Sequence, residues 1–368
     1  MIIQKKPLKN DLSFFVGITT ILLVTGLLFI YSASSVFALE KYGSAHMYLK
    51  KQLIGLMLGL VAAFIIQWIP LSYIKKSTPY LFFASLGLTA LPLITALGKN
   101  IHGSSRWVKL FISFQPSELL KIFFILYLAY FLTKKSKNNF SPLYNYFQLL
   151  AVIGLISIIL LKQPDFGLMV TFIITTSIVL LIIKRHLKYG AITILAGIPL
   201  LFVLVIAKAY RLQRVLIFLN PWADPQGAGF QIIQSLIAIG SGGFFGTGIG
   251  HSKQKFFYLP MQHTDFIFSI IAEEAGFFGT TAIIFLFLLF LYFGLRIVWQ
   301  LHQQFSQLAT LGFVTIISLQ ALINICVTTG LAPTKGIGLP FISYGNTALV
   351  CQIIMIGIII SFVNKDEI

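Results

Sequence analysis

The sequence predicts an all-α polytopic membrane protein of about ten transmembrane helices, with one long extracytoplasmic loop between helices 7 and 8. Three observations lead to this fold class. Apolar residues make up 57% of the chain, and the mean hydropathy is +0.91. Charged residues make up only 10%. The apolar residues also gather in runs of about 20, the length that crosses a hydrocarbon layer roughly 30 Å thick. A soluble globular protein is therefore excluded.

Charges, prolines and glycine clusters divide the chain into the expected spans. These spans fall near residues 14–32, 52–69, 79–98, 118–133, 144–161, 167–183, 189–207, 266–295, 308–328 and 339–362. The last is interrupted by polar residues and glycines. The first is too long for the apolar part of a cleavable signal peptide, so we expect it to be a span. We expect a single integral-membrane domain over residues 1–368, with both termini on one side because the number of spans is even.

The distribution of positive charge predicts which side that is. The chain has 27 Lys and Arg against 10 Asp and Glu, a net charge of +17. Because the cations flank apolar runs and do not gather on a soluble face, nucleic-acid binding is excluded and contact with membrane lipid is expected. With the termini inside, thirteen cations fall in inner segments and eight in short outer loops. Both termini are therefore predicted to be cytoplasmic.

The long outer segment from about 208 to 265 removes this bias, because it carries five further cations. These are Lys208, Arg211, Arg214, Lys253 and Lys255. Long loops cross the membrane regardless of their charge, which is one explanation. The other is an outer site for an anionic, phosphate-bearing substrate.

Two further patterns exclude familiar kinds of site. Cys326 and Cys351 lie in apolar runs without metal-ligand spacing, so neither a disulfide framework nor a zinc site is expected. The glycine-rich run 240–250 is followed by no Lys-Ser/Thr pair and has no βαβ context, so it is not a nucleotide loop. We expect these glycines to allow a re-entrant backbone that packs against protein or lines a wet space.

An ionisable group in an apolar region is costly and needs an explanation. Six of the ten acids lie in or beside apolar runs: Glu118, Asp165, Asp224, Asp265, Glu273 and Glu274. Asp265 directly precedes a long apolar span. It is either a helix cap or a general base at the membrane surface, which a helix dipole and nearby cations would keep ionised.

The other acids have simpler explanations. Glu118 and Lys121 stand three residues apart and are expected to neutralise each other. Asp165 and Asp224 follow or precede prolines and are expected in turns, although Asp165 could also orient a substrate. The neighbouring Glu273 and Glu274 lie about 100° apart on a helical wheel, so they are not expected to face the same partner.

Six motifs together resemble the SEDS family of peptidoglycan glycosyltransferases, whose members include FtsW, RodA and SpoVE. The motifs are S-R-W at 105–107, F-Q-P-S-E-L-L-K at 114–121, Q-P-D-F-G at 163–167, N-P-W-A-D-P at 220–225, Y-L-P-M-Q-H-T-D-F-I-F with A-E-E-A-G at 258–276, and N-I-C-V-T-T-G-L-A-P-T-K-G-I-G-L-P-F-I-S-Y-G at 324–345. The resemblance covers essentially the whole chain. It is closer to the division branch, FtsW, than to the elongation branch, RodA.

The resemblance implies a fold, a reaction and partners. The family has ten transmembrane helices with cytoplasmic termini and polymerises lipid II at the outer face of the bacterial inner membrane. For a division member it implies action at the septum, with a class B penicillin-binding transpeptidase and other divisome proteins as partners. Two alternatives stay open: a lipid II transporter that works through Glu118, Glu273 and Glu274, and a non-catalytic division scaffold.

The resemblance also implies site residues. The catalytic Asp of the family falls on Asp265. Candidates for the sugar diphosphate are the outer cations Arg106, Lys109, Arg211, Arg214, Lys255 and Lys335. Arg106 and Arg214 come first among them, because Arg suits bidentate phosphate contacts. We assign to the architecture of the cavity Glu118, Lys121, Asp165, His263 and Thr264.

Two positions depart from the family pattern. Asn346 replaces the second Gly of S-Y-G-G, and if positive φ is needed there, Asn is the least costly substitute. Met261 replaces the Glu of L-P-E, which removes a carboxylate near Asp265. No cofactor or metal ligand is assigned, and a divalent cation is left open.

Overall fold

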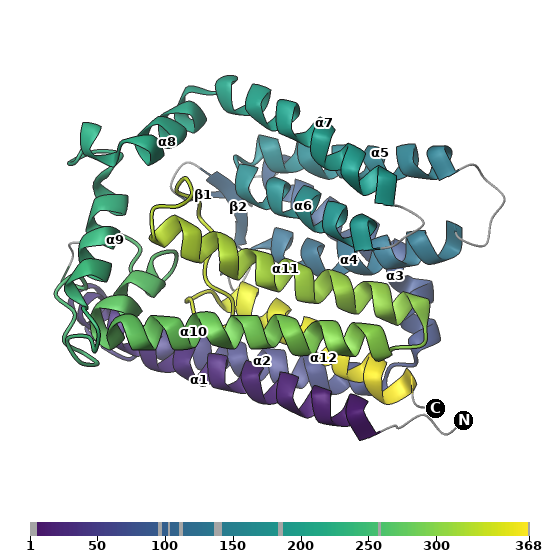
Figure 1. The fold of residues 1–368 in the computed structure, drawn as a ribbon, viewed down its shortest axis with the longest axis horizontal. Coiled ribbons are helices and arrows are strands. Elements are labelled where there is room, and N and C mark those ends of the chain that lie inside the picture. Colours follow the sequence, from purple (N-terminus) through teal and green to yellow (C-terminus); the bar gives the residue numbers. More distant parts are fainter. Residues whose placement is uncertain are drawn as a thin grey trace.

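The chain folds into a bundle of long apolar helices in the computed structural model (Figure 1). The structure describes residues 6–94, 98–101, 104–109, 113–135, 142–182, 187–256 and 259–366. Ten helices match the expected spans: α1 (Lys6–Tyr42), α2 (Met47–Trp68), α3 (Leu71–Ile94), α4 (Pro116–Lys135), α5 (Pro142–Lys162), α6 (Phe166–Ile182), α7 (Leu187–Ile206), α10 (Ile267–Gln300), α11 (Gln304–Thr328) and α12 (Asn346–Asp366).

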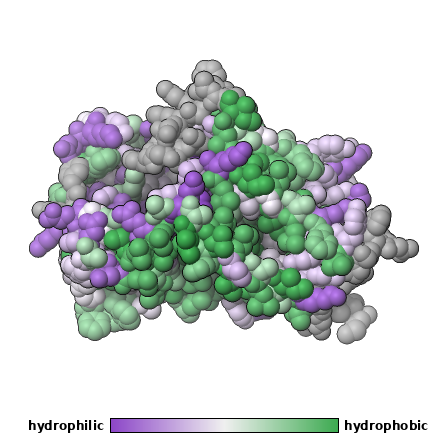
Figure 2. All heavy atoms as spheres, turned by 90° about the horizontal axis from the view of Figure 1, so that it is seen from above, coloured by the Kyte–Doolittle hydropathy of each residue, from purple (hydrophilic) through white to green (hydrophobic). Residues whose placement is uncertain are grey.

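Nine of these helices are long and apolar enough to cross a membrane within the described ranges, and α6, with 17 residues, falls just short. The predicted multi-pass, all-helical fold class is confirmed. Figure 2 shows hydrophobic residues over most of the middle of one face, with hydrophilic residues gathered towards its two ends. The two chain ends lie at the same end of the bundle in Figure 1.

Several helix boundaries differ from the sequence prediction. The first helix extends beyond the predicted 14–32 at both ends, from Lys6 to Tyr42. The third helix begins at Leu71 instead of near 79, because Pro79 is accommodated inside it. The last begins at Asn346 instead of near 339. Gly338 and Pro340 precede it, and Phe341 has a φ of 64°, so this stretch cannot be helical.

Two connections between the spans contain structure that the sequence did not predict. Between α3 and α4 lies a small antiparallel sheet of β1 (Gly98–Ile101), β2 (Ser104–Lys109) and β3 (Ser113–Phe114) in the order β1-β2-β3. Between α7 and α10 the long segment forms α8 (Ala209–Leu219), the short 3-10 helix η2 (Pro221–Ala223) and α9 (Phe230–Ser241). Both α8 and α9 lie at the end of the bundle away from the termini (Figure 1).

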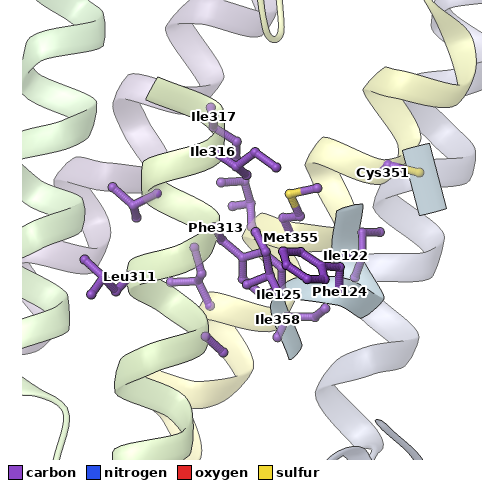
Figure 3. Packing of buried hydrophobic residues seen from close by; sticks show 14 of the residues in the cluster. Ile122, Phe124, Ile125, Leu311, Phe313, Ile316, Ile317, Cys351, Met355 and Ile358 are labelled. Carbon is purple, nitrogen blue, oxygen red and sulfur yellow. The ribbon is translucent and has the colours of Figure 1, made fainter. Parts of the chain in front are cut away.

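The core lies where α4, α11 and α12 meet. These helices bury most of their length, whereas α2 and α7 bury little of theirs. Figure 3 shows Phe313 and Ile316 of α11 beside Phe124 of α4 and Met355 of α12. The exposed apolar faces of α2 and α7 suit a lipid surround, since hydrocarbon and leucine side chains are equally apolar.

The connection between α11 and α12 is a non-helical segment, residues 331–345, held between helices. Its backbone finds partners in three buried amide side chains. Asn324 of α11 donates to the Ile337 carbonyl, Gln352 of α12 accepts from the Phe341 amide, and Gln52 of α2 accepts from the Gly345 amide. Irregular backbone at membrane depth is stable only with such partners.

Gly26 of α1 allows this segment to approach. A Cβ at position 26 would lie 2.4 Å from the Phe341 carbonyl oxygen and 2.7 Å from the Ile342 Cα. Both atoms belong to the backbone and cannot move away cheaply. A side chain at this position would therefore push α1 from the 331–345 segment.

We predict that Gly26→Ala destabilises the protein by about 1–3 kcal/mol, the usual cost of overpacking. Gly17→Ala is the matched control in the same helix, because a Cβ there meets nothing within 4 Å. Thermal unfolding in detergent would measure both. Equal melting temperatures for the two variants would contradict the close approach.

Candidate functional site

Asp265 lies two residues before α10, at the end of the bundle that carries α8 and α9. Helix α10 has no side-chain cap at its N-terminus, and no hydrogen bond among the described residues ends on the Asp265 carboxylate. The helix-cap explanation of this residue is therefore wrong. The carboxylate is partly buried and remains available for another group.

The backbone around Asp265 is fixed by the 331–345 segment and α11. Asn324 donates to the Asp265 carbonyl oxygen as well as to that of Ile337, each at 2.8 Å. The Ser343 hydroxyl donates to the Thr264 carbonyl at 2.6 Å. The Tyr344 amide donates to the His263 carbonyl at 2.9 Å. The main chain on both sides of the carboxylate is thus held from a second segment.

Arg106 of β2 approaches the same place. A Cβ on Gly336 would lie 3.6 Å from Asp265 Oδ2 and 3.9 Å from Arg106 Nη1, so both side chains come close to the space that this glycine leaves open. Arg106 Nη2 donates to the Pro164 carbonyl, and Nε lies 3.5 Å from Asp165 Oδ2. The guanidinium is thereby oriented with Nη1 towards Asp265.

Two further cations complete this cluster. Arg214 of α8 donates to the Thr334 carbonyl at 3.2 Å, which brings α8 to the 331–345 segment. The Lys335 stem crosses Gly167, where a Cβ would lie only 2.8 Å from its Cε. We call Arg106, Arg214, Lys335, Asp165 and Asp265 the outer charge cluster.

Burial and charge act in opposite directions on this cluster. Burial raises the pKa of Asp265 to about 6, although the charges of Arg106 and Arg214 lower it. Burial likewise lowers the pKa of Lys335 to about 8, against the effect of Asp165. At neutral pH Asp265 is mostly ionised and still able to accept a proton.

Two other predicted cations make different contacts. Arg211 is buried, donates to the Leu204 carbonyl at 2.8 Å and lies 5.0 Å from the Phe166 ring centre, so it holds the α7–α8 corner to α6. Lys255 is buried 3.4 Å from Glu274. The side chain of Lys109 lies outside the described part of the structure.

The remaining predicted residues have structural contacts. Glu118 and Lys121 form a buried ion pair at 2.7 Å, as their spacing predicted. His263 packs against the rings of Tyr48 and Phe37, and burial together with the charge of Lys41 lowers its pKa to about 4. His263 is therefore neutral at pH 7. The Thr264 hydroxyl donates to the Met261 carbonyl at 3.1 Å.

Glu273 and Glu274 bind the loop that precedes Asp265, and both contact Ser252. The Ser252 hydroxyl donates to Glu273, and its amide donates to Glu274 Oε1 at 3.3 Å. Glu273 also accepts from the Lys253 amide at 2.8 Å, and Ser32 of α1 donates to Glu274 at 2.7 Å. The expectation that the two carboxylates face different partners is wrong, because the loop crosses both faces of the helix.

Gly276 explains how the loop comes so close. It has a φ of 66° and breaks the regular geometry of α10. The Phe277 amide then donates to the Gly243 carbonyl at 2.9 Å, and the Thr247 amide to the Glu273 carbonyl at 2.9 Å. The glycine-rich run therefore packs against the first turns of α10, which agrees with the expected tight backbone packing.

A resident divalent cation is not favoured by the donor set. In the described ranges no three His, Cys, Asp or Glu side chains come together in a way that could hold a metal ion. Within the outer charge cluster Asp165 already pairs with Arg106. The two carboxylates of the cluster alone do not supply the six or more oxygen ligands that hard cations prefer.

Comparison with known proteins places this chain in a family. A family model described as cell cycle protein, FtsW/RodA/SpoVE, matches residues 13–367. The chain belongs to the FtsW/RodA/SpoVE family. It is 37% identical over 342 residues to the probable peptidoglycan glycosyltransferase FtsW of Geobacter sp. (strain M18), with 93% of each chain covered. It is also 37% identical over 345 residues to stage V sporulation protein E of Bacillus subtilis, with 94% of each covered.

Solved structures agree. A chain of a peptidoglycan synthase complex that coordinates polymerization and crosslinking matches with a TM-score of 0.78 and 28% identity, covering 96% of this chain and 97% of that one. The rod shape determining protein RodA of Thermus thermophilus matches with a TM-score of 0.71 at 24% identity and the same coverage, which shows a common fold.

The two departures from the FtsW/RodA/SpoVE pattern have structural consequences. Asn346 is the first residue of α12 and does not have positive φ, so no left-handed conformation is needed there. Met261 does have positive φ, at 56°. Its carbonyl accepts from the Thr264 amide at 3.0 Å, which closes the turn that leads to Asp265.

Sequence reasoning missed the residues that position Asp265. Asn324, Ser343 and Gly336 were part of a long motif without separate roles. A polar Asn in the apolar run of α11 was the available signal, because a buried amide at membrane depth needs partners. Nothing local indicated that side chains from two distant elements approach Gly336.

We predict that Arg106→Gln raises the pKa of Asp265 by roughly 1 unit, because a nearby opposite charge lowers a carboxyl pKa. The infrared band of the protonated carboxyl, isolated by subtracting the Asp265→Asn spectrum, would be followed against pH. Arg296→Gln is the control, since Arg296 pairs with Asp11. An unchanged Asp265 pKa in Arg106→Gln would contradict the geometry.

We predict that Glu274→Gln destabilises the protein by about 3–5 kcal/mol, because it leaves the Lys255 ammonium buried without a counter-charge. Hydrogen exchange of the amides at 246–256 should increase. Glu274→Gln combined with Lys255→Met should recover much of the stability, since no unpaired charge remains. If the double variant is no more stable than the single one, the ion pair is not the cause.

Proposed function

We propose that the chain is a peptidoglycan glycosyltransferase that polymerises lipid II, with Asp265 as general base. The observation that carries the proposal is the Asp265 carboxylate, which lies just before the first turn of a span and does not cap that helix. It lies near Arg106, and the charge of Arg214 also acts on it. Glycosyl transfer from a lipid diphosphate needs a base for the attacking hydroxyl and cations for the leaving group.

The reaction would be a single inverting displacement. The 4-hydroxyl oxygen of one lipid-linked sugar attacks C1 of the sugar on a second lipid diphosphate and forms the new glycosidic bond. Its proton passes to Asp265. The bond between C1 and the diphosphate oxygen breaks, and the bonding electrons leave with the diphosphate. A base with a pKa of about 6 suits this step, because it is ionised at neutral pH yet basic enough to accept the proton.

The cations of the outer charge cluster would bind the departing diphosphate. Arg106 uses Nε and Nη2 for protein contacts, and no hydrogen bond among the described residues occupies Nη1. Arg214 likewise has only Nη1 engaged. Lys335 supplies a third charge. These groups stabilise charge that grows in the transition state, which is how such a site accelerates the reaction. Arg211, Lys255 and Lys109 remain weaker candidates for substrate contact.

The similar proteins support this proposal. The relative from Geobacter sp. is named a probable peptidoglycan glycosyltransferase, and the solved complex carries out polymerization and crosslinking. By the same reasoning a class B penicillin-binding transpeptidase and other divisome proteins are proposed partners. We also propose cytoplasmic termini, so that Asp265 faces outward, and a place at the division septum of the inner membrane.

The contacts of the buried glutamates do not favour the transporter alternative. Glu118 pairs with Lys121, Glu274 binds Ser32 and Lys255, and Glu273 accepts from loop amides. A carrier needs ionisable groups that change partners during transport. These three acids are instead bound within the fold.

We predict that Asp265→Asn lowers the rate of lipid II polymerisation by about 10²–10⁴-fold, the usual contribution of a general base. Purified protein with its transpeptidase partner and labelled lipid II would be assayed for glycan strands. Glu40→Gln, an exposed carboxyl-to-amide change at the end of α1, should keep wild-type activity. A folded Asp265→Asn protein that polymerises at the wild-type rate would exclude the base assignment.

A further inference from the structure

A second candidate site lies at the other end of the bundle, between α3 and α4. A cavity of about 590 Å³ is lined by Ser72, Lys75, Lys76, Pro79, Tyr80, Phe83 and Tyr130. It lies near the chain termini, because Lys365 of α12 donates to the Ile69 carbonyl in the turn just before α3. The outer charge cluster, at the opposite end of the helices, plays no part in it.

The part of this cavity nearest the start of α3 is cationic. Lys75 and Lys76 line it, and Lys134 lies beside it, donating to the Tyr130 hydroxyl at 3.2 Å. None of the lining residues is acidic. Lys76 is exposed, and no hydrogen bond or ion pair from the described residues occupies its ammonium group. Such a cluster attracts an anion, and no acidic residue of the described ranges lines the cavity to supply one.

The rest of the cavity is apolar and faces outward. Pro79, Tyr80 and Phe83 follow the lysines along α3, and Tyr80 and Phe83 are 76% and 54% exposed. From Ser72 to Phe83 the helix rises about 16 Å at 1.5 Å per residue. A ligand that fills this length therefore meets cations at the chain-end side and aromatic rings nearer the middle of the membrane.

We propose that this cavity binds an anionic phospholipid from the membrane leaflet at the side of the termini. The phosphodiester would lie between Lys75 and Lys76, and the first part of an acyl chain would lie along Tyr80 and Phe83. Basic cavities between transmembrane helices on the cytoplasmic side suit anionic lipid headgroups. A free phosphate would fill only the cationic half and leave the aromatic half without a ligand.

Native mass spectrometry of the detergent-solubilised full chain tests this. Phosphatidylglycerol, cardiolipin and the zwitterionic phosphatidylethanolamine would be titrated separately. We expect the protein to retain the anionic lipids. The double variant Lys75→Gln/Lys76→Gln should bind them more weakly, on the order of tenfold, because each lysine beside an anionic headgroup contributes about 1 kcal/mol to binding. The single variant Lys76→Gln should show part of this loss. Melting without added lipid checks that each variant is folded.

The matched control is Lys50→Gln/Lys51→Gln, an adjacent exposed pair in the first turns of α2. It removes the same charge at the opposite end of the helices and should keep wild-type lipid retention. Equal loss in the two double variants would overturn the proposal, because it would show general attraction only. So would equal binding of phosphatidylethanolamine.

A second experiment distinguishes binding of a lipid from binding of a free anion. Inorganic phosphate and glycerol phosphate would be added in thermal unfolding experiments beside phosphatidylglycerol. We expect only the lipid to raise the melting temperature through Lys75 and Lys76. Protection by inorganic phosphate as large as that by the lipid would overturn the lipid assignment.

Discussion

Backbone polar groups inside a membrane must find partners within the protein, and the arrangement around Asp265 depends on this constraint. Two segments near the site are not helical: the glycine-rich loop before α10, and residues 331–345. Side chains of neighbouring helices bind both. Glu273 binds the loop before α10, and residues 331–345 are bound by Gln52, Asn324 and Gln352. These polar groups in the apolar helices make irregular backbone possible beside the proposed reaction centre.

At Asp265 these contacts hold the main chain, and among the described residues no hydrogen bond holds the carboxylate. Its carbonyl is held by Asn324, which also holds Ile337, so the two segments keep a fixed spacing. Gly336 has no side chain to fill the space that the carboxylate and Arg106 both approach. The proposed base and the proposed phosphate-binding cation are thus held near each other without forming a direct salt bridge. Such an ion pair would lower the basicity of the carboxylate and occupy the guanidinium.

The fold was largely predictable from the sequence, because a membrane span is a property of one continuous segment. The spans and the Glu118–Lys121 pair depend on residues close in the chain, and both were predicted. The boundary at Leu71 was missed because α3 continues through a proline, Pro79. The boundary at Asn346 was missed because the glycine- and proline-rich stretch before it does not form a helix. The small sheet before α4 was missed because short strands leave little signal in an apolar sequence.

The site was predictable only in part, for a different reason. Motifs identified Asp265 and Arg106, and the suitability of Arg for phosphate contacts singled out Arg214. Which other cations lie near them depends on contacts between distant segments. Lys255 stands in the same outer segment as Arg214, yet its ammonium is bound to Glu274. Local sequence could not separate the two, because both are basic residues beside apolar ones. Burial decides between them: Lys255 is 4% exposed beside a carboxylate, whereas Arg214 is exposed and, among the described residues, donates to one carbonyl.

The net charge of +17 therefore has several physical roles. Some cations are neutralised within the fold, as Lys121 and Lys255 are, because a buried charge needs a partner. Lysines near the termini, such as Lys75 and Lys76, line the cavity that we propose for an anionic lipid. Arg106 and Arg214 keep part of their guanidinium groups unoccupied beside a carboxylate. Counting charges predicts orientation, but only the partner of each cation shows whether it serves the fold, the lipid boundary or the substrate.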